Sequence, residues 1–260
     1  MPAPRTPEGR AGLAALRADP AGALVAIDYD GTLAPIVEDP TEAVPAAGAV
    51  EALTALAARV GRVAVVTGRP AAVVVDLGGL TVVPGLVVMG QYGVERWSGG
   101  DVESPEPAPG IAVARDELPA MVARVGAVLE DKGHSLVVHG RTAPRGALER
   151  LAGPVAALAE RTGLEMHPGR LVLELRPPGF DKHGALLAVA TPPPAAVLFA
   201  GDDRGDGRAF DAVDELRASG VPGVTVFSDS AEGPDELRDR ADLVVDGPAG
   251  VVELLQELLP

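Results

Sequence analysis

The sequence predicts an α/β protein in which a doubly wound parallel sheet carries a second, smaller α/β unit. Short apolar runs alternate with helical patterns rich in Ala and Leu, such as residues 46–60. The apolar runs lie at residues 23–28, 63–67, 86–89, 196–201, 224–227 and 243–245. This alternation of strands and helices is typical of a parallel sheet covered on both faces. The pattern changes between residues 104 and 176, where we expect a separate domain.

The stretch 104–176 begins with a Pro- and Glu-rich link (SPEPAPG) that leads to a predicted helix. The apolar residues of this helix share one face: Leu118, Met121, Val122, Val125 and Leu129. A strand, a second helix and two closely spaced strands follow at residues 135–139, 145–161, 164–167 and 171–175. We therefore expect a cap domain at residues 104–176 and a catalytic core made of residues 1–103 and 177–260. The expected hinges are the Pro-rich link and residues 176–179, which end regular structure.

Two aspartates follow the first buried run, because residues 23–33 read ALVAIDYDGTL. Asp28 and Asp30 are thus predicted at the carboxyl end of a strand, where open α/β sheets bind ligands. Strand side chains alternate, so these two can converge while Tyr29 points elsewhere, and Gly31 lets the chain turn. Two carboxylates about 4 Å apart repel by roughly 4 kcal/mol at an effective dielectric near 20. A cation between them is favoured, and oxygen ligands favour Mg²⁺, although Asp-x-Asp-Gly alone is equally typical of a polar turn.

A second polar segment follows the next buried run, where residues 63–69 read VAVVTGR. Thr67 ends this predicted strand, and Gly68 and Arg69 are expected to open the next helix. A hydroxyl group and unpaired backbone amides at a helix N-terminus form a phosphate site. Taken by itself, the segment is equally typical of an ordinary helix N-cap.

Two more charged segments complete the pattern. Lys182 begins an apolar helical stretch just after a Pro-Pro-Gly turn, and Asp202, Asp203 and Asp206 follow the run at residues 196–201. A lone lysine is usually a solvated charge. The acidic cluster is harder to explain by structure alone, because crowded carboxylates at a strand end are unfavourable without a cation.

The four segments, in this order, resemble the haloacid dehalogenase superfamily of phosphatases. Over nearly its whole length the chain is similar to the trehalose-6-phosphate phosphatase family within that superfamily. Three segments outside the catalytic set carry the likeness further: residues 90–95 (GQYGVE), 135–141 (SLVVHGR) and 174–182 (ELRPPGFDK). Four positions depart from the family pattern. Tyr92 stands where His is common, Gly140 where Tyr is common, His183 interrupts a Lys-Gly pair, and Gly207 replaces an acidic residue.

The resemblance implies a phosphatase that hydrolyses trehalose 6-phosphate by way of an aspartyl-phosphate. Asp28 would be the nucleophile and Asp30 the general acid and base. Thr67 and Lys182 would hold the phosphate oxygens. The implied Mg²⁺ ligands are the carboxylate of Asp28, the backbone carbonyl of Asp30 and the side chain of Asp202. Asp203 and Asp206 would lie behind these ligands, and one of them would anchor Lys182.

The resemblance also implies a set of substrate contacts: Gly68, Arg69, Gln91, Tyr92, Glu95, His139, Arg141 and Glu174. Glu174 is the main candidate in the cap, because the apolar residues Leu171, Leu173 and Leu175 alternate around it and place it on the polar face of a strand. His139 and Arg141 are equally consistent with cap packing or a surface ion pair. We attach function to the glycines Gly31, Gly68 and Gly201, where the backbone must pass close to phosphate or metal.

Composition narrows the class of protein. The chain of 260 residues contains no cysteine, which excludes disulfides, thiolate catalysis and zinc-thiolate sites. A formal charge of −15 argues against nucleic acid and anionic membrane surfaces as partners. No signal-peptide core is visible at the N-terminus, and no apolar run approaches the ~20 residues of a membrane span. We expect a cytoplasmic monomer whose partner is a small sugar phosphate.

Three other interpretations stay open. The chain is also consistent with a phosphatase of the same superfamily that acts on sucrose-6-phosphate, mannosyl-3-phosphoglycerate or a trehalose-like pseudo-disaccharide phosphate. A catalytically silent sugar-phosphate-binding module is the second, although the intact Asp28, Lys182 and Asp202 argue against it. A phosphotransferase, such as a mutase that passes the phosphoryl group to a sugar, is the third.

Overall fold

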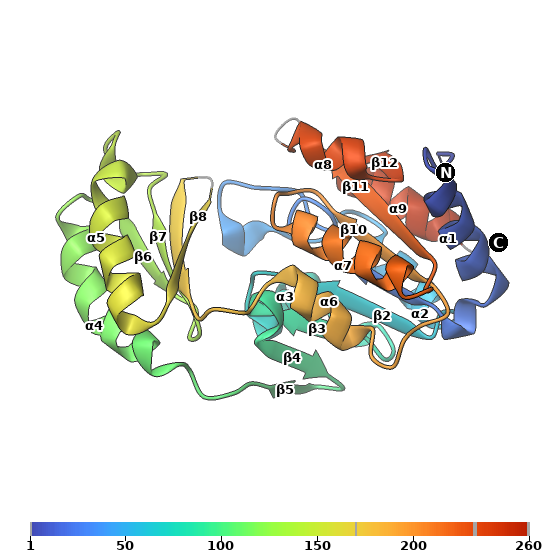
Figure 1. Ribbon diagram of the computed structural model, residues 1–260, viewed down its shortest axis with the longest axis horizontal. Helices are drawn as coiled ribbons and strands as arrows, with labels where there is room; N and C mark the ends of the chain where they lie inside the picture. Colours follow the sequence, from blue (N-terminus) through green and yellow to red (C-terminus); the bar gives the residue numbers. More distant parts are fainter. Residues whose placement is uncertain (1, 170, 231–232, 259–260) are drawn as a thin grey trace. The chain divides into compact units, whose positions relative to one another are not determined.

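Two compact units make up the protein. A computed structural model describes residues 2–169, 171–230 and 233–258. Contacts divide the chain into a core unit, Met1–Ser104 with Asp181–Pro260, and an inserted unit, Pro105–Phe180 (Figure 1). Each unit has its own hydrophobic core, so each is described by itself.

The core unit is organised around a sheet in which the described residues place eight strands, in the order β12-β11-β10-β1-β2-β3-β4-β5. From β12 to β3 all neighbours are parallel. Their bounds are β1 (Leu24–Ile27), β2 (Arg62–Val66), β3 (Val87–Gly90), β10 (Val197–Gly201), β11 (Gly223–Asp229) and β12 (Leu243–Asp246). These are the apolar runs that the sequence predicts as strands. Every residue of β1 and β10 is buried, as expected for parallel strands covered on both faces.

Two short antiparallel strands extend one edge of this sheet and are not predicted from the sequence. They are β4 (Glu95–Ser98) and β5 (Asp101–Glu103), and they pair with β3 and with each other. Both are largely polar, and β4 is partly exposed while β5 is exposed at every residue, so they lack the apolar run on which the prediction of the other strands depends.

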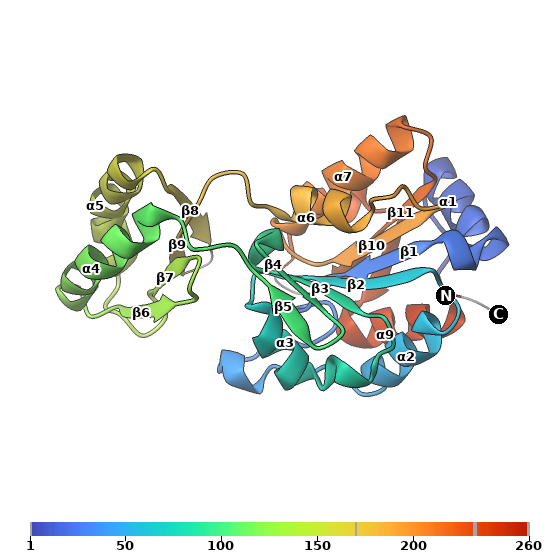
Figure 2. The same ribbon diagram turned by 90° about the horizontal axis from the view of Figure 1, so that it is seen from below.

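Helices cover both faces of the large sheet (Figure 2). One face is covered by α2 (Ala49–Ala57), α3 (Ala71–Gly78) and α9 (Gly247–Glu257). Apolar residues of α1 (Pro7–Ala18) belong to the same hydrophobic core. The other face carries α6 (Lys182–Val189), α7 (Asp206–Ala218) and α8 (Asp235–Arg240). Single 3-10 turns lie at η1 (Pro20–Gly22), η2 (Pro40–Glu42), η3 (Leu80–Val82) and η4 (Gln91–Gly93). No helix within the described ranges is both long and apolar enough to cross a membrane.

The inserted unit is an antiparallel sheet packed against two helices. Its strand order is β6-β7-β9-β8, with β6 (Val128–Asp131), β7 (Leu136–His139), β8 (Glu165–Gly169) and β9 (Val172–Arg176). Apolar residues of α4 (Pro109–Ala123) and α5 (Ala147–Thr162) pack on Val138 and Leu173 of the sheet. The expectation that Leu129 extends the first helix is wrong. The helix ends at Ala123, Gly126 turns the chain with a φ of 70°, and Leu129 lies in β6.

Asp242 ties the N-terminal helix to the sheet. Its side chain accepts hydrogen bonds from the backbone N–H and the hydroxyl of Thr225, at 2.7 and 3.0 Å. The hydroxyl of Thr6 and the guanidinium of Arg217 also donate to this carboxylate. Thr6 in turn caps α1, because its Oγ1 accepts from the N–H of Gly9. One buried carboxylate therefore holds a helix cap, a strand and α7 together.

Replacing Asp242 by Asn is expected to lower the free energy of unfolding by about 3 kcal/mol, because it places amide hydrogens against donors and leaves the partly buried guanidinium of Arg217 with Asp214 as its remaining charge partner. Chemical denaturation of the purified protein measures this loss. Asp239→Asn, an exposed position on α8, is the matched control and should change stability by no more than about 0.5 kcal/mol. Equal stabilities of the two variants would contradict the role given to Asp242.

Candidate active site

Three of the predicted site residues lie at one edge of the large sheet because their strands are neighbours. β1 pairs in parallel with β10 on one side and with β2 on the other. Asp28, Thr67 and Asp202 each follow the last residue of one of these strands. Parallel neighbours end at the same edge, and this is the edge where such sheets bind ligands.

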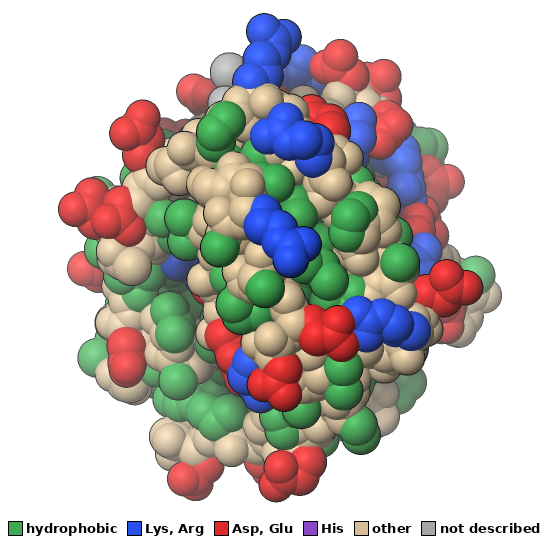
Figure 3. Space-filling model, turned by 90° about the vertical axis from the view of Figure 1, so that its left-hand side faces the viewer, with side chains coloured by type: hydrophobic (Ala, Val, Ile, Leu, Met, Phe, Trp, Pro, Cys, Tyr) green, Lys and Arg blue, Asp and Glu red, His purple; other side chains and the backbone are tan. Residues whose placement is uncertain are grey.

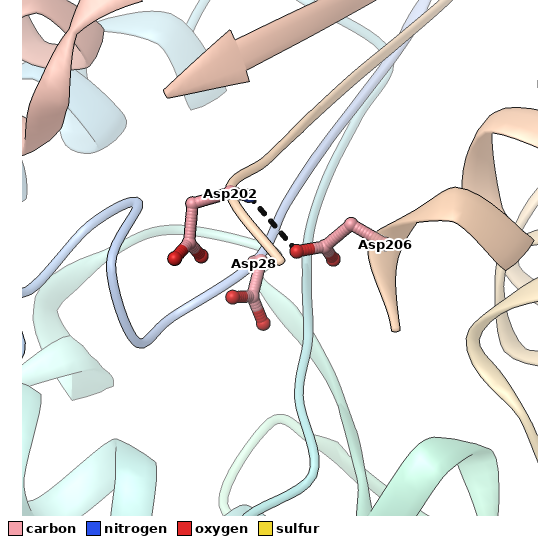
Figure 4. A group of neighbouring side chains, drawn as sticks. All are labelled: Asp28, Asp202 and Asp206. Carbon is pink, nitrogen blue, oxygen red and sulfur yellow. Dashed lines mark hydrogen bonds between the residues drawn. The ribbon is translucent and has the colours of Figure 1, made fainter. Parts of the chain in front are cut away.

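Among the described residues, the carboxylates of Asp28, Asp202 and Asp206 offer oxygen atoms that all lie within 4.8 Å of one another (Figure 4). All three side chains are buried. Asp206 begins α7, and its Oδ2 accepts hydrogen bonds from the backbone N–H groups of Asp202 and Asp203, at 2.9 and 3.0 Å. Asp203 is exposed, and its Oδ1 accepts from the N–H of Asp206. The strand end and the helix start are thus locked to each other.

Lys182 enters this acidic cluster from α6. Its Nζ donates to Oδ1 of Asp28 at 2.6 Å and to Oδ1 of Asp206 at 2.7 Å. Lys182 is 5% exposed, so it is not the solvated charge that a lone lysine usually is. Asp181 fixes the start of its helix, because Oδ1 accepts from the N–H of Gly184 and Oδ2 pairs with Arg208 of α7.

Burial and charge crowding set the electrostatics of the cluster. Burial raises the pKa of the Asp28 carboxyl well above its usual range; Lys182 opposes this shift and Asp202 adds to it. Burial, with the carboxylates of Asp206 and Asp203, raises the pKa of Asp202 from 3.8 to about 8. Burial alone would lower the pKa of Lys182, but Asp206 and Asp28 outweigh it and raise that pKa. A single ammonium therefore faces more carboxylates than it can neutralise.

The donor set fits a hard divalent cation, because it consists of oxygen atoms alone. Both carboxylate oxygens of Asp206 already accept hydrogen bonds, one from Lys182 and the other from backbone N–H groups. Asp206 is therefore better suited to holding Lys182 than to binding a cation. Asp28 receives Lys182 at Oδ1, and within the described residues no second donor reaches its side chain. Asp202 accepts from the hydroxyl of Thr32 at 3.3 Å. Asp28 and Asp202 are thus the side chains best placed to hold a cation.

Glycines allow the backbone to approach these carboxylates. Gly31 has a φ of 79°, and a Cβ atom there would lie 2.1 Å from Oδ2 of Asp202. A Cβ atom at Gly201 would lie 2.3 Å from Cγ of Asp206. The carbonyl of Gly31 accepts a hydrogen bond from the buried Ser228 at 2.7 Å. The turn after β1 therefore has no room for a side chain.

The segment after β2 differs in one respect from the prediction. The expectation that Gly68 and Arg69 open the next helix is wrong, because α3 begins at Ala71, after Pro70. The buried Thr67 instead accepts from the N–H of Arg69 at its Oγ1, at 3.1 Å, in a tight turn. A Cβ atom at Gly68 would lie 2.7 Å from the Tyr92 hydroxyl. The turn is thus packed under the Tyr92 ring.

Asp30 lies outside the group of three clustered carboxylates. Its side chain instead accepts two hydrogen bonds from the guanidinium of Arg69, both at 2.7 Å. The two aspartates of the first motif therefore have different cationic partners, Lys182 for Asp28 and Arg69 for Asp30.

Three predicted contacts, Gln91, Tyr92 and Glu95, form a buttress against this turn. The backbone N–H groups of Gln91 and Tyr92 donate to the carbonyls of Arg69 and Thr67, each at 2.9 Å. Gln91 and Tyr92 have φ values of 46° and 60°, in the left-handed region. Glu95 accepts from the N–H of Ala71 and from the side-chain amide of Gln91, both at 2.7 Å. Both oxygens of Glu95 are therefore engaged inside the fold, one of them at the start of α3.

The remaining predicted contacts lie in the inserted unit. Glu174 is buried on β9, where Oε1 accepts from the hydroxyl of Ser135 at 2.9 Å and lies 3.9 Å from Nζ of Lys132. His139 pairs with Glu130 at 2.8 Å, and Arg141 is exposed. The alternation predicted from Leu171 is incomplete, because β9 begins at Val172 and Leu171 is exposed with a φ of 55°.

Four polar residues of these clusters escape the sequence analysis. Thr32 and Ser228 pack behind the site in the core unit, and Ser135 and Lys132 surround Glu174 in the inserted unit. Ser228 directly follows a predicted strand, and Thr32 belongs to the Asp-Gly-Thr turn. Ser228 and Thr32 could have been predicted from these positions after the strands. Lys132 has no such signal, because its role depends on contacts distant in the chain.

Solved structures of other proteins define the fold class of this chain. The solved structure of a haloacid dehalogenase-like hydrolase from Bacteroides thetaiotaomicron is similar, with a TM-score of 0.67, 14% identity and coverage of 91% of this chain and 99% of that one. The C-terminal domain of the trehalose-6-phosphate phosphatase of C. albicans has a TM-score of 0.79 and 20% identity, covering 99% of this chain and 98% of that one. At these identities the likeness establishes the fold, which is that of the haloacid dehalogenase-like hydrolases.

Sequence comparisons define the family. A family model described as trehalose-phosphatase matches residues 26–241. The trehalose-phosphate phosphatase of Mycobacterium tuberculosis is 35% identical over 247 residues, which cover 90% of this chain. The chain belongs to the trehalose-phosphatase family, as the motifs in its sequence predict. It spans about 60% of the length of the curated relatives that it matches.

Replacing Gly31 by Ala is expected to destabilise the protein by about 2–4 kcal/mol, because a left-handed backbone and a clash with the Asp202 carboxylate act together. Chemical denaturation and a phosphatase assay measure the two consequences, and catalytic activity should fall with stability. Gly85→Ala is the matched control: its φ is 64°, no atom lies within 4 Å of the added Cβ, and the cost should be about 1 kcal/mol. Equal effects of the two variants would contradict the close approach to Asp202.

The raised pKa of Asp202 predicts a pH dependence of the metal-free protein. The folded state holds the Asp202 proton more tightly than the unfolded state, so its stability should fall as pH rises from about 4 to about 8. Thermal unfolding in EDTA should therefore show the melting temperature dropping across this window, and a divalent cation should restore it. Asp202→Asn should flatten the dependence. An Asp202→Asn variant with the wild-type slope would contradict the assignment.

Proposed function

We propose that the protein is a magnesium-dependent phosphatase that hydrolyses trehalose 6-phosphate to trehalose and phosphate. The observation that carries this proposal is the buried contact between Lys182 and Asp28, at 2.6 Å, beside two further carboxylates. A buried lysine in that position leaves one oxygen of Asp28 to act as a nucleophile. Membership of the trehalose-phosphatase family supports this choice of substrate.

The proposed reaction has two steps, both centred on phosphorus. In the first, the Oδ2 atom of Asp28 attacks phosphorus, the P–O bond to the sugar breaks, and Asp30 gives a proton to the departing sugar oxygen. In the second, Asp30 takes a proton from water, whose oxygen attacks phosphorus. The P–O bond to Asp28 breaks, and phosphate leaves. Lys182 and Thr67 hold the phosphate oxygens while their charge redistributes.

A bound Mg²⁺ ion would be held by the side chains of Asp28 and Asp202 and by the backbone carbonyl of Asp30. When bound, it supplies positive charge that neutralises the transferring phosphoryl group. The surplus of carboxylates around Lys182 supports this role. Asp206 anchors Lys182, and Asp203 accepts from the backbone of Asp206.

Recognition of the sugar is assigned to two sets of side chains. In the core unit, Gln91, Tyr92 and Glu95 stand beside the turn that carries Thr67. In the inserted unit, Glu174, His139 and Arg141 are the proposed partners of the disaccharide hydroxyl groups. Figure 3 shows one face of the molecule, on which Lys and Arg side chains are interspersed with acidic and apolar ones.

The nucleophile is tested by Asp28→Asn. The amide cannot form the aspartyl-phosphate, so phosphate release should fall at least about 10³-fold while the fold stays intact. Malachite-green detection of phosphate measures the loss, and circular dichroism measures the fold. Asp76→Asn, the same change at an exposed position on α3, should keep wild-type activity. Substantial turnover by the Asp28 variant would overturn the mechanism.

The substrate is tested by magnesium-dependent phosphate release across a panel of phosphomonoesters. Trehalose 6-phosphate should show the highest kcat/KM. The other members are sucrose-6-phosphate, glucose-6-phosphate, mannosyl-3-phosphoglycerate and a pseudo-disaccharide phosphate. A higher kcat/KM for one of these would replace the substrate but keep the chemistry. Transfer of the phosphoryl group to an added sugar instead of water would indicate a phosphotransferase, and no turnover of any member would indicate a silent binding module.

A further inference from the structure

The contact between Arg69 and Asp30 is a fork of two hydrogen bonds. Nε of Arg69 donates to Oδ2 of Asp30 and Nη2 donates to Oδ1, each at 2.7 Å. A guanidinium and a carboxylate that meet in this way fix each other's orientation, and a lysine cannot reproduce the geometry. The side chain of Asp30 is 39% exposed, so burial alone does not hold it in one rotamer. Its orientation therefore depends on Arg69.

Arg69 is itself held by the surrounding fold. Its Nη1 donates to the carbonyl of Pro40 at 2.7 Å, and the guanidinium lies 5.8 Å from the centre of the Tyr29 ring. Its backbone N–H donates to Thr67, and its carbonyl accepts from the N–H of Gln91. The Arg69 side chain is 16% exposed. These contacts come from the segments that flank the predicted phosphate site, so the guanidinium is placed before any substrate arrives.

We infer that Arg69 is a positioning residue that acts through Asp30, rather than a contact of the substrate. This inference rests on the proposed function, in which Asp30 gives a proton to the leaving sugar oxygen and takes one from water. A carboxyl group transfers a proton well only when it is held at the reacting oxygen, and a misplacement of about 1 Å can lower the rate about 100-fold. Arg69 supplies the restraint that the half-exposed side chain of Asp30 lacks.

The alternative is that Arg69 binds the phosphate or the sugar directly, as the sequence analysis expects. The two roles differ in whether the effect of substituting Arg69 depends on an intact Asp30. A positioning residue has no effect once Asp30 can no longer transfer a proton, whereas a substrate contact acts independently of Asp30. A double-mutant cycle therefore separates the two roles.

The experiment compares Arg69→Lys, Asp30→Asn and the double variant on two substrates. Trehalose 6-phosphate has a leaving oxygen that needs a proton, while the phenolate of 4-nitrophenyl phosphate leaves without one. Arg69→Lys should lower kcat on trehalose 6-phosphate about 10- to 100-fold with little change in KM. The loss of kcat on 4-nitrophenyl phosphate should be smaller. The ratio of the losses on the two substrates should be the same for Arg69→Lys as for Asp30→Asn. The double variant should be no slower than Asp30→Asn.

Two controls keep the result interpretable. Arg96→Lys, the same change at an exposed arginine of β4, should keep wild-type kinetics. Arg69→Gln retains a side-chain N–H donor and serves as a second variant if Arg69→Lys does not fold, as judged by thermal unfolding. It should show the same dependence on Asp30.

The inference is overturned if the Arg69 variants raise KM equally for both substrates, or if their effects add to that of Asp30→Asn. Those results would make Arg69 a substrate contact. A wild-type protein that releases no phosphate from either substrate would instead refute the proposed function. The failure of the positioning role and the failure of the proposed function are therefore distinguishable.

Discussion

The predicted catalytic site is built around the buried contact of Lys182 with Asp28 and Asp206. Lys182 is 154 positions from Asp28 and 24 positions from Asp206 in the chain. The contact therefore brings the end of β1 together with the starts of α6 and α7. Charges removed from water are unfavourable unless they are paired and hydrogen-bonded. The surrounding structure supplies that pairing: Asp181 caps the helix of Lys182, and backbone N–H groups fix Asp206. The remaining excess of negative charge explains why a cation suits the site.

Much of the core unit is predictable from the sequence, because its parallel strands are continuous apolar runs and their carboxyl ends carry the polar motifs. Asp28, Thr67 and Asp202 come together for that reason alone. The antiparallel pair β4 and β5 could not be predicted, since polar strands at a sheet edge show no apolar run. The end of α4 before Leu129 depends on one turn at Gly126, which an apolar periodicity does not reveal.

Side-chain pairing is the part that the sequence analysis missed most often. The fork between Arg69 and Asp30 spans 39 positions, and the contact of Glu95 with the start of α3 spans 24. Such pairs depend on the exact placement of turns, which residue types do not specify. The family resemblance indicates which residues matter, and the contacts indicate how each one acts. Arg69 and Glu95 are both predicted as ligand contacts, and each also has partners inside the fold. The structure also gives each unit its own apolar core, and the predicted catalytic residues all belong to the core unit.

If a phosphoryl group passes through Asp28, it should be possible to trap that covalent intermediate in the protein. The protein would be mixed with a phosphomonoester that it turns over, quenched in acid within one turnover, digested and analysed by mass spectrometry. Passage through Asp28 predicts one added phosphoryl group on the peptide that contains Asp28, and none on that peptide from Asp28→Asn. Turnover without a trapped intermediate, or a phosphoryl group on another residue, would contradict it.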